Sequence, residues 1–480
     1  MRSHTLNDDI LVNILSFASL KTIPSMMQTC RVFYHEGPKV LLASGAAFGG
    51  LEQIPAFLRF ILAEDGTRCR YLGQFHLLIE EEDDNEEGPV HQTVEMDTGI
   101  ARSLVALFCH HDFPLLHTLA LDPAEMLLTA IPGLSSALST LPSVKVVNFR
   151  SAGPMTCKII KGMRKLTDVR LAYSPFRWKA LASQLHPLFV LEDSRNTLER
   201  LDVSFFDEPL PRSRYPQQFS QMRSLKLGWC SQLAIAPFAY AFPHLRRLTY
   251  EVMVDHDDLD TDEVIALHQQ HRQEFSAYST WRELEAASGR FFDLYVSGLA
   301  CQINDVQVFM DPQQTFAMLH DFLNDVRPSK LYLRIPRHGI GVEASALPDL
   351  FRSQAGSRLR NLSLHIEFAQ EEKDMDLGAA MGALRGALGT LHGLRSLELT
   401  FQCSAIPEIR LDVYTPSTLA TCLAEEYLQQ LDLVDFARSF LLAVPSLERV
   451  GVDLTGLRGR SREEVQVLED GTVTTTINRW

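Results

Sequence analysis

One short pattern recurs along most of this chain and limits what it can fold into. An apolar residue is followed by two variable residues, a second apolar residue, one variable residue and a third apolar residue. We call the second apolar residue of each unit its marker; the markers are Phe75, Leu119, Val147, Val169, Leu201, Leu225, Leu248, Val306, Leu331, Leu362, Leu397 and Val450. Most markers lie 22 to 35 residues apart, which is the length of one strand, one helix and a return.

The last two apolar positions of each unit alternate with a variable residue, as in a short half-buried strand. Helix-compatible stretches lie between units, including Thr98–His111, Trp178–Leu191 and Leu377–Leu391. A strand and a helix repeated about a dozen times predict an α/β solenoid with a parallel sheet on the concave face and helices on the convex face. The alternative is an ordinary α/β domain with several amphipathic strands.

The pattern resembles the leucine-rich-repeat family, whose usual signature is L-x-x-L-x-L-x-x-N. The resemblance covers roughly residues 70–455 and is irregular. The Asn of that signature is replaced in four of the better units by Ala124, Ser174, Phe206 and Cys230. We therefore expect an irregular solenoid.

Long gaps between markers predict insertions. The acidic run Glu80–Glu87 predicts a loop, because like charges repel one another. One long helix is expected from about Asp262 to Ala287 and another from about Ser417 to Leu442. Near the C-terminus, Asp470-Gly471 between two alternating runs predicts a β-hairpin over Val465–Ile477 that covers the edge of the last repeat.

The first 42 residues have a different pattern, with apolar residues at helical spacing from Leu6 to Phe17 and again from Ile23 to Tyr34. Asn7 and two acids can cap the first helix. Gly37-Pro38 is expected to end the segment. So few residues cannot bury all this apolar surface among themselves, so part of it must face the solenoid or a partner. The predicted domains are a helical domain (1–42), the repeat solenoid (43–455) and a hairpin cap (456–480).

The N-terminal segment resembles an F-box. The resemblance is carried by Leu6-Asn-Asp-Asp9-Ile10-Leu11-Val-Asn-Ile14-Leu15, then Thr22-Ile23, then Met27-Gln-Thr-Cys30-Arg31-Val-Phe33-Tyr34. Asn7 stands where the family usually has Pro, and Asp9 where it has Glu. The resemblance implies docking on a Skp-type adaptor, and through it on a cullin, by Leu6, Ile10, Leu11, Ile14, Leu15, Ile23 and Met27.

Composition excludes several classes of function. With 45 Lys and Arg against 60 Asp and Glu, the formal net charge is −15, which argues against a nucleic-acid binder and against a polybasic membrane-surface protein. No apolar run is long enough to span a bilayer, and acids precede the first apolar cluster, unlike a secretory signal. The eight cysteines form no C-x-x-C pair. A cytoplasmic or nuclear location is expected.

The common catalytic motifs are absent, so no catalytic residue, cofactor or metal is predicted. The best candidate ligands for a metal ion are His268 and His271, with Glu274 nearby on the same predicted helix. Because no third ligand is fixed by the sequence, a solvated polar helix face is the favoured interpretation.

The concave face offers a candidate target-binding surface. Third and fifth positions of the repeat units point away from the core, and around markers 169 to 248 they are locally basic. Aromatic residues follow these strands, and Arg beside Trp is typical of interface hot spots. The candidate target-binding residues are Arg170, Trp178, Arg200, Lys226, Trp229 and Arg247.

Together the two resemblances imply the substrate-recognition subunit of a cullin–RING ubiquitin ligase, in which the solenoid binds an unidentified target protein. The alternative is a ligase-independent interaction scaffold whose N-terminal helices only cap the first repeat. Exposure of the apolar face of those helices distinguishes the two functions.

Overall fold

The computed structural model describes residues 7–79, 97–174, 185–206, 217–230, 234–252, 260–310, 315–335, 350–351, 356–368, 376–403, 423–457 and 460–478. The chain packs as two compact units: residues 1–232 with 241–244, and residues 233–240 with 245–480. The acidic run at 80–87 and the first residues of the helix predicted from Ser417 to Leu442 lie outside the described residues. No helix in the described part of the chain is long and apolar enough to cross a membrane.

The first unit begins with three helices and continues with parallel strands in chain order. Its helices are α1 (Asp8–Phe17), α2 (Ile23–Met27), α3 (Arg31–Ala43), α4 (Ile54–Ile61), α5 (Thr98–His110), α6 (Ala124–Ala130), α7 (Leu134–Ser139), α8 (Pro154–Gly162) and α10 (Pro187–Val190). Its strands are β1 (Ala46–Phe48), β2 (Gln74–Leu78), β3 (Thr118–Asp122), β4 (Val146–Ala152), β5 (Asp168–Tyr173), β6 (Arg200–Ser204) and β7 (Ser224–Cys230).

The second unit continues the same alternation and ends in an antiparallel hairpin. Its helices are α11 (Ala236–Ala241), α12 (Thr261–Tyr278), α13 (Phe291–Val296), α14 (Phe316–Val326), α17 (Leu377–Leu388), α18 (Leu423–Gln430) and α19 (Leu433–Ala443). Its strands are β8 (Arg247–Val252), β9 (Glu283–Arg290), β10 (Gln302–Phe309), β11 (Lys330–Ile335), β12 (Asn361–Glu367), β13 (Ser396–Gln402), β14 (Arg449–Thr455), β15 (Arg462–Leu468) and β16 (Val473–Asn478).

The repeat markers explain the register of the strands in each unit. In the first unit Phe75, Leu119, Val147, Val169, Leu201 and Leu225 pair in one unbroken row. In the second unit the row runs Leu248, Ala287, Val306, Leu331, Leu362, Leu397 and Val450. All these side chains are buried. The expected α/β, solenoid-like fold with a mostly parallel sheet is therefore present in each unit.

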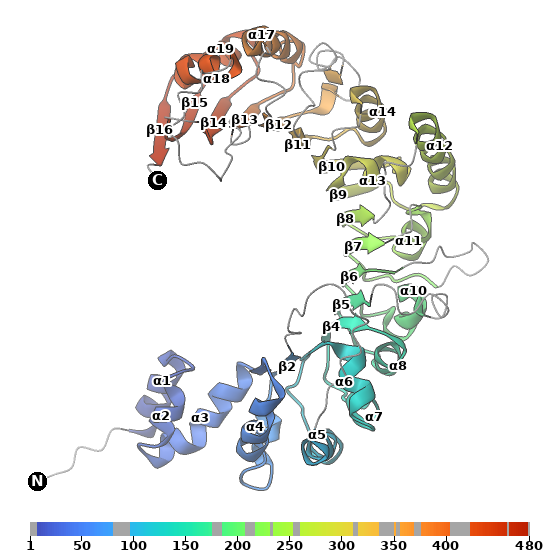
Figure 1. Cartoon of the computed structure of the whole chain (residues 1–480), viewed down its shortest axis with the longest axis vertical. Coiled ribbons are helices and arrows are strands. Elements are labelled where there is room, and N and C mark those ends of the chain that lie inside the picture. Colours follow the sequence, from blue (N-terminus) through green and yellow to red (C-terminus); the bar gives the residue numbers. More distant parts are fainter. Residues whose placement is uncertain are drawn as a thin grey trace, which may run out of the picture. The chain divides into compact units, whose positions relative to one another are not determined.

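Helices lie on one face of the strands in each unit, and in the second unit the strands follow an arc with the helices on its outer side (Figure 1). This arrangement buries the marker face beneath the helices. The third and fifth positions of the strands lie on the opposite face, which the described helices do not cover. The expected placement of strands and helices is thus seen in the arc of the second unit.

Two of the expected helices differ from the structure. The helix predicted from Asp262 to Ala287 ends at Tyr278, and its last residues belong to the strand β9. Of the helix predicted from Ser417 to Leu442, the described residues form two shorter helices, α18 and α19. The hairpin predicted around Asp470-Gly471 is confirmed, since β15 and β16 pair antiparallel on either side of it.

Candidate protein-docking surface

The helix α1 forms because its first turn is capped and acidic. The Asn7 side chain accepts a hydrogen bond from the Asp9 backbone N–H, and Asp8 and Asp9 lie where the helix dipole favours negative charge. One side of the helix packs on α2 and α3, in a small core built around Leu15, Ile23 and Phe33. The α1 residues Leu11 and Ala18 pack against the same core.

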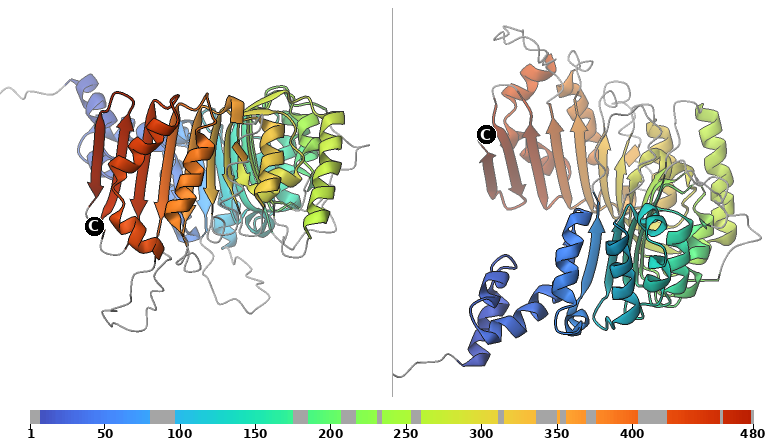
Figure 2. Two further views of the ribbon diagram at one scale, coloured as in Figure 1. Left: turned by 90° about the horizontal axis from the view of Figure 1, so that it is seen from above. Right: turned by 60° about the horizontal axis from the view of Figure 1, so that its bottom comes forward.

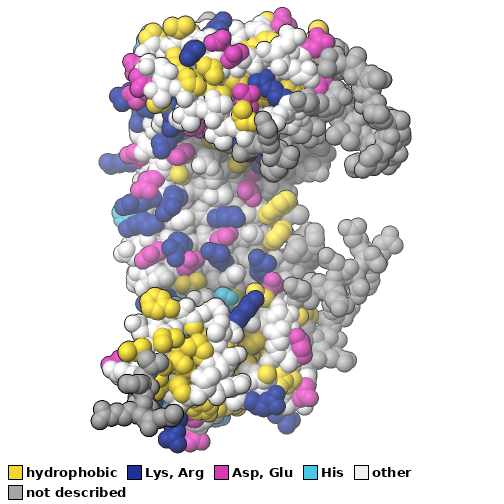
Figure 3. All heavy atoms as spheres, turned by 90° about the vertical axis from the view of Figure 1, so that its left-hand side faces the viewer, with side chains coloured by type: hydrophobic (Ala, Val, Ile, Leu, Met, Phe, Trp, Pro, Cys, Tyr) yellow, Lys and Arg dark blue, Asp and Glu magenta, His cyan; other side chains and the backbone are white. Residues whose placement is uncertain are grey.

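A second apolar stripe on α1 has no partner among the described residues. Ile10, Ile14 and Phe17 are spaced four and three residues apart, so they lie along one side of the helix, beside the stripe that faces the core. Their exposed fractions are 48%, 42% and 86%. Leu20, just beyond the helix, is also half exposed. We call Ile10, Ile14 and Phe17 the α1 stripe; Figure 3 shows hydrophobic side chains gathered at this end of the first unit.

The predicted adaptor-binding residues divide into two groups. Ile10 and Ile14 are exposed on the α1 stripe, while Leu6 lies outside the described residues. Leu11 and Met27 are half buried against the small core. Leu15 and Ile23 are fully buried in it, so a partner cannot contact Leu15 or Ile23 without unfolding the helices. Phe17, which is the most exposed member of the α1 stripe, is absent from the predicted set, although its helical spacing from Ile10 and Ile14 indicates the same side of the helix.

The α1–α3 cluster is joined to the first repeat by a continuous helix. The expected end of the segment at Gly37-Pro38 is wrong: both residues lie inside α3, which runs to Ala43. The buried Arg68 places its guanidinium carbon 5.4 Å from the centre of the Tyr34 ring of α3 and 4.9 Å from that of Phe60 of α4. Its guanidinium also donates to the Phe60 carbonyl and to Glu64 Oε1, 2.9 Å away, which lowers the pKa of Glu64.

The predicted basic strip of the first unit carries its own counter-charges. Arg200 Nε lies 2.8 Å from Asp168 Oδ2, and Lys226 Nζ lies 3.9 Å from Asp202 Oδ2. Arg170 is exposed and lies opposite Asp202 in the register of β5 and β6. Burial raises the pKa of Asp202, against the opposing effect of Lys226 and Arg170. The surface is therefore a patchwork of both signs, suited to polar side chains of a protein partner.

An aromatic pair lies at the end of these strands. Trp229 is 53% exposed and stacks on Phe205, with ring centres 6.3 Å apart. Both residues have positive φ, 52° and 60°, a conformation that bulky side chains adopt only when their surroundings hold them in it. Trp178 lies outside the described residues, and Arg247 is exposed on β8 of the second unit.

The two histidines of α12 are buried, so the expected solvated helix face is wrong. His268 Nδ1 and His271 Nδ1 each lie 2.7 Å from a backbone carbonyl oxygen of α13, those of Tyr295 and Val296. The ring of His268 also stacks on Tyr295 at 4.0 Å. These contacts fasten α12 to α13. In the part of the chain that the structure describes, no group of three or more His, Cys, Asp or Glu side chains could hold a metal ion.

No protein-family model matches the chain, and no curated protein matches its sequence. Among solved structures, a chain of the crystal structure of the Rad7 and Elc1 complex in yeast is similar, with 14% sequence identity and a TM-score of 0.32. The match covers 85% of this chain and 97% of that chain.

Proposed function

We propose that this chain is the substrate-recognition subunit of a cullin–RING ubiquitin ligase. In this proposal the α1–α3 cluster docks on a Skp-type adaptor, and through it on a cullin, while the repeat units bind a target protein. The observation that carries the proposal is the exposed α1 stripe, on helices whose sequence resembles an F-box. Such a receptor acts in the cytoplasm or nucleus.

The alternative, a scaffold whose N-terminal helices only cap the first repeat, accounts less well for this stripe. A cap buries its apolar side chains against the solenoid. Here Leu15 and Ile23 are already buried in the small core and Leu11 packs against it, while the α1 stripe lies outside it. An exposed apolar stripe rimmed by polar residues is typical of a protein-docking surface.

The receptor role needs no covalent chemistry from this chain. Binding a target beside the ubiquitin-loaded enzyme raises the local concentration of its lysines and orients them. The target-binding surface that we propose in the first unit consists of Arg170, Arg200 and Lys226 with Trp229 at the strand ends. Trp178 and Arg247 remain further candidates from the sequence.

The proposal predicts that Ile14→Glu weakens binding of a purified Skp-type adaptor by at least about thirtyfold, because a carboxylate would be desolvated at the centre of the stripe. The measurement is isothermal titration of the full chain with the adaptor. Val12→Glu is the matched control: Val12 is 39% exposed on the same helix, but it projects on the other flank of the core-facing stripe. Its affinity should stay close to that of the unchanged chain.

Thermal melting separates docking from capping. Ile14 is already half exposed, so Ile14→Glu should leave the melting temperature nearly unchanged. Leu11→Glu is a poorer probe because Leu11 packs against the small core. The docking proposal fails if the full chain does not bind the adaptor, or if Ile14→Glu destabilises the whole protein without a selective loss of adaptor binding.

A further inference from the structure

The strand β16 forms the outermost edge of the second unit. It pairs with β15 on one side, and Figure 2 shows no neighbouring strand on its other side. The backbone groups on that side have no strand partner among the described residues. An edge of this kind is a template for adding another strand.

The hairpin geometry identifies which residues offer these backbone groups. The Leu468 backbone N–H donates to the Thr472 carbonyl, so these residues form the first hydrogen-bonded pair after the turn. In an antiparallel pair such positions alternate, and Thr474 and Thr476 are therefore the residues that bond to β15. The N–H and C=O groups of Val473, Thr475 and Ile477 consequently point outward from the sheet.

The side chains of these three residues lie on the face of the sheet that α19 covers at β14 and β15, but on β16 they are exposed. Val473 lies opposite Val467 and Thr475 opposite Val465 in the register of the hairpin. Val465 and Val467 are buried, and α19 packs on β14 and β15. One strand further out, Val473, Thr475 and Ile477 are exposed. The apolar face of the sheet therefore continues uncovered onto β16.

This edge lacks the features that usually block strand addition. Residues 473–477 read Val-Thr-Thr-Thr-Ile, with no charge and no proline. Edge strands are commonly protected by lysine, proline or a bulge. Valine, threonine and isoleucine are instead residues that favour strands.

We propose that β16 is a self-association surface on which a second copy of this chain adds its own β16, antiparallel, about a two-fold axis at Thr475. In this register Thr475 faces its own copy, and Val473 faces Ile477 of the other copy. All three outward-pointing residues of each strand then exchange backbone hydrogen bonds. Thr474 faces Thr476, so the side-chain pairs are matched in size and free of like-charge repulsion.

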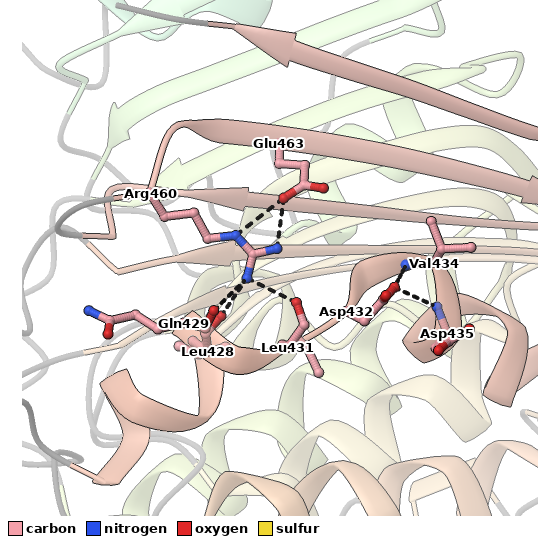
Figure 4. A network of polar contacts seen from close by, with 8 residues as sticks. All are labelled: Leu428, Gln429, Leu431, Asp432, Val434, Asp435, Arg460 and Glu463. Carbon is pink, nitrogen blue, oxygen red and sulfur yellow. Dashed lines mark hydrogen bonds and ion pairs between the residues drawn. The ribbon is translucent and has the colours of Figure 1, made fainter.

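Side-chain contacts join the start of the hairpin to the rest of the second unit. The Arg460 guanidinium donates to the carbonyl oxygens of Leu428 and Leu431, at 2.7 and 2.9 Å, where α18 ends, and to Glu463 at the start of the hairpin (Figure 4). Arg462 Nη2 lies 2.7 Å from Asp453 Oδ2 on β14. A pre-ordered edge loses less conformational entropy on association.

The first test is sedimentation velocity of the full chain over a range of concentrations. We expect a monomer–dimer equilibrium, because a six-residue edge alone is smaller than most permanent interfaces. Thr475→Pro removes an N–H that the hairpin itself does not use, and should raise the dissociation constant by at least about tenfold. Thr475→Ala, which keeps that N–H, is the matched control and should dimerise nearly as well as the unchanged chain.

Disulfide trapping tests the register without relying on the proline. Thr475→Cys places two sulfurs opposite each other across the two-fold axis, at a Cα separation of about 5.5 Å that a disulfide can bridge. Ile477→Cys faces Val473 instead and should not cross-link above the level of the unchanged chain, which controls for the exposed Cys109. A chain that stays monomeric at every concentration overturns the proposal, as does equal cross-linking of the two cysteine variants.

Discussion

Replacing Asp293 with alanine is expected to lower the free energy of unfolding of the second unit by about 3 kcal/mol. The Asp293 side chain is fully buried at the start of α13. Its Oδ2 accepts from the Val252 backbone N–H at 2.9 Å and from Arg290 Nε at 3.1 Å. Removing the carboxylate leaves a buried N–H without its acceptor and Arg290 without its counter-charge. Arg290 is partly exposed, so water limits the loss to the lower part of the range for buried ion pairs.

Urea denaturation followed by far-UV circular dichroism measures this change. The matched control is Asp321→Ala, an exposed acid on α14 in the same unit, which should change the free energy of unfolding by less than about 0.5 kcal/mol. Asp293→Asn keeps the volume and one acceptor oxygen, so its loss should be smaller than that of alanine. Equal stability of the Asp293 and Asp321 alanine variants would show that the buried carboxylate does not hold β8 to α13.

Gly298→Ala should lower the free energy of unfolding of the second unit by about 3 kcal/mol or more. Gly298 follows α13 with φ of +73°, where an alanine is strained. A Cβ there would also lie 2.3 Å from the Arg272 backbone nitrogen and 2.4 Å from the His271 carbonyl carbon. These are backbone atoms of α12, so the helix as a whole would have to move away from α13.

Gly382→Ala is the control for this substitution. Gly382 lies inside α17, and a Cβ there would meet no atom within 4 Å. Alanine in place of glycine within a helix should therefore raise the free energy of unfolding by about 0.5–1 kcal/mol. Opposite signs for the two substitutions are expected in chemical denaturation, and a neutral Gly298→Ala would contradict the close approach of α12 to the turn after α13.

The sequence pattern predicts most of the rows of this fold, because every marker is an apolar side chain that the helices bury. It fails where a row is filled by smaller residues. At β9 the marker position is Ala287, with Gly289 as the third apolar position, and neither has enough apolar surface to be recognised as part of the repeat. Gly289 is required there, because a Cβ would lie 2.1 Å from the Tyr250 carbonyl oxygen of β8. The sequence pattern therefore predicts the end of a long helix where the structure has this strand.

Local sequence rules also fail where packing overrides them. Gly37-Pro38 favours a helix end, yet α3 continues through both residues. A Cβ at position 37 would lie 2.4 Å from Met27 Cγ, so Gly37 permits the close contact between α2 and α3. Beyond Pro38, Val40 and Leu41 pack against the same small core. Helix propensity is a weak guide when such contacts are present.

The candidate docking surface could be predicted only in part. Helical periodicity identifies an apolar side of α1, but it does not say which of two adjacent stripes is covered by α2 and α3. That depends on how the three helices cross, and this places Leu15 in the core and Ile14 outside it. For the same reason the periodicity of α12 does not predict that His268 and His271 form hydrogen bonds with backbone carbonyl oxygens of α13.

The unbroken course of α3 has a mechanical consequence. The helix α3 belongs both to the α1–α3 cluster and to the start of the first repeat. The Arg68 guanidinium contacts the Tyr34 ring of α3 and the Phe60 ring of α4, and so joins the two helices. The three-helix cluster and the first repeat thus share one element, which is not interrupted between Arg31 and Ala43. Four residues inserted in α3 would translate the cluster by about 6 Å and rotate it by about 40°. Under the proposed docking, the length of α3 sets the distance and the angle between the α1 stripe and the repeats.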